Sequence, residues 1–100
     1  MQKIDQLTEA ARANNLLKLI NFINAGVDIN QANLNGVTPL IQAATSGNFA
    51  AVELFIQAGA NLQLKNQQNL NALEAAKLFG HNNIVKLIDT YLSQHNKDDD

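Results

Sequence analysis

The stretch that decides the fold runs Asn35-Gly36-Val37-Thr38-Pro39-Leu40 and continues, two residues later, as Ala43-Ala44-Thr45-Ser46-Gly47. Thr38 has a side chain that accepts hydrogen bonds from the free N–H groups at a helix start. Pro39 suits the first helical position, where its missing N–H costs nothing. Gly47 suits the left-handed conformation in which many helices end. These residues predict a short helix that begins after Thr38 and ends at Gly47.

Equivalent residues recur 33 positions before and after this stretch. The recurring sets are Leu7, Leu40 and Leu73; Ala10, Ala43 and Ala76; Leu19, Val52 and Val85; and Phe22, Phe55 and Ile88. A unit of this length cannot bury its own apolar face, so neighbouring units must bury it by stacking. The spacing therefore predicts one supersecondary unit that is repeated three times.

Each unit carries the signals of a first helix. Side chains that cap helix starts are predicted at three equivalent positions, Asp5, Thr38 and Asn71. Glu74 is placed to complete a reciprocal cap with Asn71. Residues that favour a left-handed helix end follow in each unit, at Asn14, Gly47 and Gly80.

A second helix is predicted after each of these ends, because large apolar residues recur three and four positions apart. They are Leu16, Leu19, Phe22 and Ile23; Phe49, Val52, Phe55 and Ile56; and Ile84, Val85, Leu87 and Ile88. Gly26 and Gly59 end the first two of these helices. The segments 27–37 and 60–70, which link the helix pairs, are rich in Asn, Gln and Gly. This composition predicts an extended turn or a short hairpin.

Together these residues resemble an ankyrin repeat, whose signature is a period of 33 residues with Thr-Pro-Leu at the helix start. Ile41 stands where the family usually has His. The first and third units depart from the pattern in the way that the terminal caps of a solenoid do. The resemblance implies an all-α ankyrin-repeat solenoid of three stacked helix-turn-helix units, with short hairpin loops between them.

We expect a single domain over residues 1–96, with repeats at about 1–33, 34–66 and 67–94. Residues 97–100 end in three aspartates, which are unfavourable at the negative end of a helix. We therefore expect the last helix to end near Gln94, and residues 97–100 to form a disordered acidic tail.

The resemblance also implies where a protein partner binds, since ankyrin proteins use their hairpin tips and the concave face of the first helices. The corresponding tip residues are Leu34, Asn35, Val37, Gln67, Gln68 and Leu70. The corresponding helix residues are Arg12, Ala13, Thr45, Ser46, Leu78 and Phe79. An exposed aromatic beside an aliphatic is typical of an interface hot spot, which favours Leu78 and Phe79. The alternative is that this pair only covers the end of a short stack.

Composition excludes several other classes of partner. The chain has 100 residues, of which 46% are apolar and 16% charged, as expected for one globular domain. Its net charge of −2 offers no basic surface for nucleic acid. No apolar run approaches the roughly 20 residues that cross a bilayer, and the N-terminus lacks the apolar run of a signal peptide. We expect a cytoplasmic protein with neither a membrane nor a nucleic-acid partner.

No set of residues points to catalysis, to a metal or to a cofactor. His81 and His95 are 14 positions apart, and the chain has no cysteine, so a metal site is not expected. Glu9, Glu53 and Glu74 occupy different places in their repeats and form no acid–base pair. His81 takes the place of an asparagine in the earlier repeats, which predicts a structural hydrogen bond. The sequence therefore predicts a binding protein, not an enzyme.

The function that we expect is a protein-interaction module with one protein partner. Its amide-rich, compact form resembles bacterial ankyrin proteins, which favours an inhibitor, immunity or accessory protein. One alternative is an effector that is secreted into a host cell. Another is a self-associating structural protein, because Leu17 and Ile20 either widen the buried stripe of their helix or leave an exposed apolar end. We expect a monomer, with weak self-association as the alternative.

Overall fold

The computed structural model describes residues 3–96 of the chain, and these residues form helices and turns but no strand. The helices are α1 (Lys3–Arg12), α2 (Leu16–Asn24), α3 (Pro39–Ser46), α4 (Phe49–Gln57), α5 (Ala72–Leu78) and α6 (Asn82–Asn96). The expected all-α solenoid is confirmed. The acidic tail expected at 97–100 lies outside the described residues.

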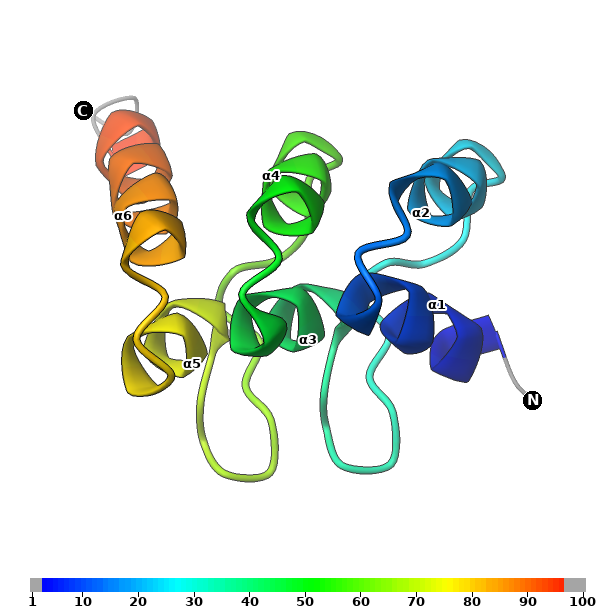
Figure 1. The fold of residues 1–100 in the computed structure, drawn as a ribbon, viewed down its shortest axis with the longest axis horizontal. Coiled ribbons are helices and arrows are strands. Elements are labelled where there is room, and N and C mark those ends of the chain that lie inside the picture. The colour runs from blue at the N-terminus through cyan, green and yellow to red at the C-terminus, as the bar shows by residue number, and fades with distance from the viewer. Residues whose placement is uncertain (1–2, 97–100) are drawn as a thin grey trace.

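The helices form two rows, and the loops project away from them (Figure 1). The first helices, α1, α3 and α5, lie side by side, and the second helices, α2, α4 and α6, form the other row. The loops that precede α3 and α5 extend from the first row, away from the second. The molecule measures 41 × 27 × 20 Å. This arrangement leaves the loops and the first helices on one continuous side of the stack.

Two of the three predicted helix starts are confirmed. The side chain of Thr38 accepts a hydrogen bond from the N–H of Ile41 at 3.2 Å, and Pro39 is the first residue of α3. The side chain of Asn71 accepts from the N–H of Glu74 at 2.9 Å. The Glu74 carboxylate in turn accepts from the N–H of Asn71 at 3.1 Å, so the reciprocal cap is present.

The third predicted start, at Asp5, is wrong. Helix α1 already includes Lys3, so Asp5 lies within its first turn. A carboxylate there is favourable for another reason, because the N-terminal end of a helix carries a partial positive charge. The two confirmed caps follow a loop that fixes where the helix can begin, whereas the described residues directly before Asp5 are already helical.

The ends of the first helices are as predicted, and the end of the last helix is not. Asn14, Gly47 and Gly80 have positive φ angles of 55°, 77° and 74°. Helix α6, however, extends past Gln94 to Asn96. No glycine or proline lies between Gln94 and Asn96 to stop the helix earlier.

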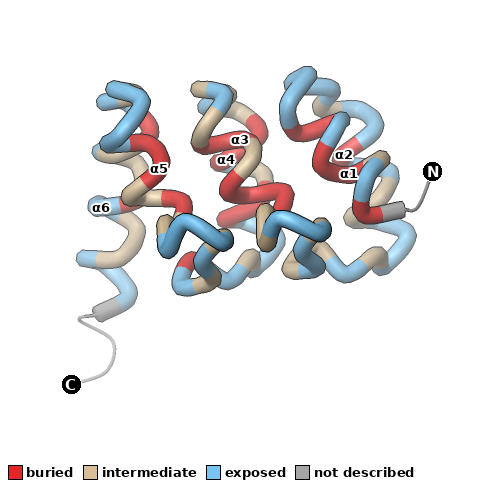
Figure 2. Tube along the Cα trace, turned by 90° about the horizontal axis from the view of Figure 1, so that it is seen from below, coloured by how far each residue is buried: buried red, intermediate tan, exposed pale blue. Residues whose placement is uncertain are grey.

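The core lies between the two rows of helices and is shared by all three repeats (Figure 2). Leu7, Leu40 and the alanines of the first helices are almost fully buried, and so are Leu19, Val52, Phe55, Ile84 and Ile88. Phe49, which belongs to the apolar pattern that predicted α4, is 36% exposed. It begins α4, and the equivalent first residue of α6 is Asn82, which supplies no apolar partner.

The outer surface of α2 is also apolar. Leu17 is 71% exposed, and Ile20 is exposed as well, so these side chains do not widen the buried stripe. Ile20 lines a shallow groove between α2 and α4 together with Leu16 and Leu54. The alternative of an exposed apolar end is therefore the one that the structure supports.

Side chains at equivalent positions connect each repeat to the one before it. The Asn48 amide donates hydrogen bonds to the carbonyl oxygens of Ala11 at 2.7 Å and Arg12 at 2.9 Å. One repeat later, Nε2 of His81 donates to the carbonyl oxygen of Thr45 at 3.0 Å. The predicted structural hydrogen bond of His81 is thereby confirmed.

Candidate protein-binding surface

The first tip, residues 33–37, is held in one conformation by its own hydrogen bonds. The Asn33 side chain accepts from the N–H groups of Asn35 at 2.9 Å and Val37 at 3.0 Å. The N–H of Gly36 donates to the Asn33 carbonyl oxygen at 2.9 Å, and the N–H of Asn33 donates to the Val37 carbonyl oxygen at 3.0 Å. The tip is a closed turn, and the described residues form no strand ladder beside it.

The second tip, residues 66–70, repeats this arrangement 33 positions later. The Asn66 side chain accepts from the N–H groups of Gln68 at 2.9 Å and Leu70 at 3.1 Å. Asn69 takes the place of Gly36 and has a φ of 66°. Asparagine tolerates this left-handed conformation better than most residues, so the turn forms without a glycine.

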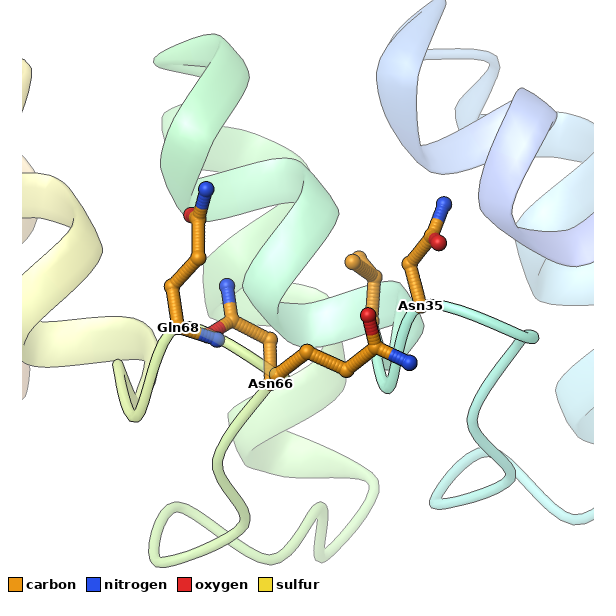
Figure 3. Close-up of a pocket in the computed structure, with 5 residues that line it drawn as sticks. Asn35, Asn66 and Gln68 are labelled. Atoms are coloured by element: carbon orange, nitrogen blue, oxygen red, sulfur yellow. The ribbon is translucent and has the colours of Figure 1, made fainter.

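The two tips are joined to each other. The N–H of Gln67 donates to the Asn35 carbonyl oxygen at 3.1 Å, and the Gln67 side chain donates to the Leu34 carbonyl oxygen at 2.9 Å. Gly36 lies against the second tip so closely that a Cβ there would be 3.0 Å from the Gln67 nitrogen. A shallow cavity of about 290 Å³ lies between the tips and is lined mainly by amides (Figure 3). Its walls are Asn35, Val37, Asn66, Gln67 and Gln68.

The predicted tip residues differ in their exposure. Leu34 is 97% exposed, and Asn35, Gln67 and Gln68 are exposed as well. Val37 and Leu70, which were expected at the surface of the tips, are half-buried. Their N–H groups bond back to the asparagine that opens each turn, and the Val37 side chain packs against the core. These two side chains therefore hold the tips in place more than they extend the surface.

The predicted residues of α1 and α3 lie near the ends of their helices. Arg12 is exposed and forms an ion pair with Glu9. Ser46 is exposed, and its hydroxyl accepts a hydrogen bond from the Gln42 side chain at 3.0 Å. Thr45 is half-buried, and its hydroxyl donates to the Ile41 carbonyl oxygen at 2.8 Å. The Thr45 hydroxyl proton is thus used inside the helix.

The predicted apolar pair lies at the end of α5. Leu78 is the last residue of the helix and is 65% exposed, and Phe79 follows as its cap and is 54% exposed. Their surface contrasts with the polar residues at the ends of α1 and α3. An aromatic side chain that is about half exposed, next to an exposed leucine, is costly for a monomer and favourable for a partner that covers both.

A polar hollow between α1 and α3 was not predicted from the sequence. It has a volume of about 310 Å³ and joins the first helices to the base of the first tip. Its walls are Asp5, Thr8, Glu9, Arg12, Asn33 and Gln42. The spacing of Asp5, Glu9 and Arg12 puts all three on one face of α1, which is the signal that could have revealed it.

Within residues 3–96, no group of three or more His, Asp or Glu side chains is placed to hold a metal ion. None of the helices in this range combines the length and the apolar character that a membrane crossing requires.

Comparisons with a family model and with solved structures show to which class of protein this chain belongs. The family model of ankyrin repeats in three copies matches residues 7–99. The chain therefore belongs to the ankyrin-repeat family. Among solved structures, 368 chains match, so the fold alone does not select a function. A comparison with curated proteins finds no match.

One similar structure is the complex of the predatory endopeptidase Bd0816 from Bdellovibrio bacteriovorus with the immunity protein Bd3460. The TM-score is 0.81, and the sequences are 30% identical over 89% of the present chain. The present chain spans 46% of the other chain, which is about half of its length.

Proposed function

We propose that this protein binds one protein partner through its two tips and the exposed ends of its first helices, and that it acts as an inhibitor or immunity protein. The observation that carries the proposal is the exposure of Leu78 and Phe79 beside a surface that, apart from Leu34, is mainly polar. Buried aromatic anchors with a polar surround account for most of the binding energy in many interfaces. Ankyrin-repeat proteins typically bind and do not catalyse, which agrees with this assignment.

The rigidity of the tips supports the proposal. Each tip is closed by an asparagine side chain, and Gln67 ties the second tip to the first. A surface that is already ordered loses little conformational entropy when it binds. A small interface of this kind can therefore be specific. The fully exposed Leu34 supplies a further apolar contact at its edge.

The chemical class of the partner is proposed from the structural neighbour. That structure is a complex of an immunity protein with an endopeptidase. We propose a peptidase as the partner here too, which would be blocked when the surface covers it. A bacterial source and a cytoplasmic location fit this role and stay predictions.

Capture experiments with single-residue variants test the binding surface. Phe79→Ala removes the aromatic anchor, and we expect the captured partner to bind at least about tenfold more weakly, equivalent to about 1.4 kcal/mol. The measurement is the affinity of the purified partner for wild type and variant. Leu17→Ala is the matched control, because it removes an exposed apolar side chain from α2 and is expected to leave the affinity unchanged.

Equal affinities for wild type and Phe79→Ala would mean that the end of α5 is not part of the interface. Weaker binding by Leu17→Ala alone would mean that the interface lies on the second helices. If the captured partner is a peptidase, its activity in the presence of the wild-type chain distinguishes inhibition from simple attachment.

A self-associating protein is the second candidate, and the exposure of Leu17 and Ile20 favours it. In that case the sedimentation coefficient of the wild-type chain rises with protein concentration. Leu17→Ala would reduce this rise, whereas Phe79→Ala would not.

A further inference from the structure

The first tip contains the one Asn-Gly pair of the sequence, Asn35 followed by Gly36. The side-chain amide of an asparagine can react with the backbone nitrogen of the next residue, because the two can close a five-membered ring. A following glycine favours this reaction, since it has no Cβ to hinder the approach. Neither protein binding nor the fold requires this chemistry.

We propose that Asn35 is a site of spontaneous deamidation in the folded protein. The Gly36 backbone nitrogen gives up its proton and forms a bond to the side-chain carbonyl carbon of Asn35. The bond from that carbon to the amide nitrogen breaks, and ammonia leaves with the proton. Water then opens the cyclic imide at either carbonyl carbon and leaves aspartate or isoaspartate. One water is consumed and one ammonia is released.

The surroundings of Asn35 leave the amide free to react. Its side chain is exposed and forms no hydrogen bond with any of the described residues 3–96. Solvent therefore reaches the carbon that is attacked and the ammonia that leaves. Figure 3 shows Asn35 on the first tip, and this residue lines the cavity between the tips.

One hydrogen bond slows the reaction. The N–H of Gly36 donates to the Asn33 carbonyl oxygen at 2.9 Å, and this bond must open before the nitrogen can attack. Exposed turns open locally at a small fraction of the free energy of global unfolding. The folded chain therefore reacts more slowly than the unfolded chain, but it still reacts.

Deamidation would change the junction between the tips. Aspartate at position 35 adds a negative charge to a cavity that is lined by neutral amides. Isoaspartate also carries the backbone through the former side chain. Since the Asn35 carbonyl oxygen accepts the Gln67 N–H at 3.1 Å, this rerouted backbone displaces the bond that joins the tips.

The second tip is an internal control with the same hydrogen bonds. Its residues at the equivalent positions are Gln68 and Asn69. Glutamine has a longer side chain, which must close a less favourable six-membered ring. The Cβ of Asn69 also hinders the approach of its nitrogen. We therefore expect Gln68 to stay intact while Asn35 reacts.

The test is to keep the purified full chain in warm, mildly alkaline buffer for several weeks and to map its peptides by mass spectrometry. We expect a gain of about one mass unit at position 35, with isoaspartate as one product. The rate should exceed that of every other asparagine by at least roughly tenfold, because no other has a glycine after it. Asn35→Gln should abolish this conversion while the thermal unfolding temperature stays close to that of wild type.

The same incubation in urea distinguishes the intrinsic reactivity of Asn35 from the protection that the folded structure provides. Faster conversion of Asn35 in urea, together with measurable conversion in the folded chain, supports the proposal. Conversion in urea alone would overturn it, because the Gly36 hydrogen bond would then protect the site completely. Conversion of other asparagines at the rate of Asn35 in the folded chain would overturn it as well.

Discussion

Gly36 and Gly26 have nearly the same backbone conformation, with φ angles of 77° and 78°, but different surroundings. A Cβ on Gly26 would meet no atom within 4 Å. A Cβ on Gly36 would lie 3.0 Å from the Gln67 nitrogen and 3.2 Å from the Asn66 Cα. Both of these contacts are with backbone, which cannot move aside easily. Substitutions at these two glycines therefore separate the free-energy cost of the left-handed conformation from the free-energy cost of the steric contact.

At the residue scale, we predict that Gly36→Ala destabilises the protein more than Gly26→Ala does. Both variants place an alanine in the left-handed region, which costs about 1 to 2 kcal/mol. Gly36→Ala also forces the tips apart, and overlap of this kind costs a further 1 to 3 kcal/mol or so, roughly as overpacking does. The free energy of unfolding in urea measures both. Equal values would mean that the tips do not depend on close contact at Gly36.

At the element scale, the equivalent residues Asn15, Asn48 and His81 show how one position serves different purposes. Asn15 caps α2 by accepting from the N–H of Lys18 at 3.2 Å. Asn48 precedes α4 but makes no side-chain cap, because its amide binds the end of α1 instead. His81 reaches the end of α3 in the same way. The side chain thus caps its own helix in the first repeat and joins two repeats in the second and third.

We predict that Asn48→Ala weakens the joint between the first two repeats. It leaves the carbonyl groups of Ala11 and Arg12 without the Asn48 amide, and each lost bond costs about 0.5 to 1.5 kcal/mol. Asn48→His should retain part of the stability, since His81 fills the same role one repeat later. Asn15→Ala is the control and should cost only the value of a cap, about 1 kcal/mol. A smaller loss for Asn48→Ala than for Asn15→Ala would contradict the role of this amide. Thermal unfolding followed by circular dichroism checks all three variants.

The elements could be predicted from the sequence because their signals are local. Thr38 and Asn71 cap their helices as expected, and the second helices follow from apolar spacing alone. The burial of individual side chains depends on the neighbouring repeat, which local patterns do not contain. Val37 and Leu70 are half-buried and Phe49 is partly exposed for this reason. The hollow between α1 and α3 was missed because it needs two helices at once, and the link from Gln67 to Asn35 needs two tips.

At the scale of the whole molecule, the three repeats form one shared core. The radius of gyration is 12.7 Å, close to the roughly 13 Å of an ordinary domain of this length. The stack is therefore about as compact as a globular domain of this length. Ala43 lies fully buried in the middle repeat, on the helix that packs against both α1 and α5. A disruptive substitution of Ala43 therefore affects the packing of both α1 and α5.

We predict that Ala43→Glu abolishes folding of the entire chain. An unpaired buried charge costs several kcal/mol or more, which is comparable to the total stability of about 5 to 15 kcal/mol of a typical small protein. Gln57→Glu adds the same charge at an exposed position of α4 and should unfold like wild type. The measurement is the loss of the cooperative unfolding transition. A normal transition for Ala43→Glu would contradict the packing of α3 between its neighbours.

The contact between Asn48 and the first repeat has a consequence for how such a chain could grow. The atoms that Asn48 binds are backbone carbonyls at the end of α1, and the equivalent end of α3 offers the same groups to His81. The middle repeat therefore contains both the side chain that donates and the backbone carbonyl groups that accept in this contact between repeats. A tandem duplication of residues 34–66 would place a second Asn48 beside Thr45 of the original copy. A repeat added by gene duplication would thus need no new side chain to form a hydrogen bond with the repeat before it.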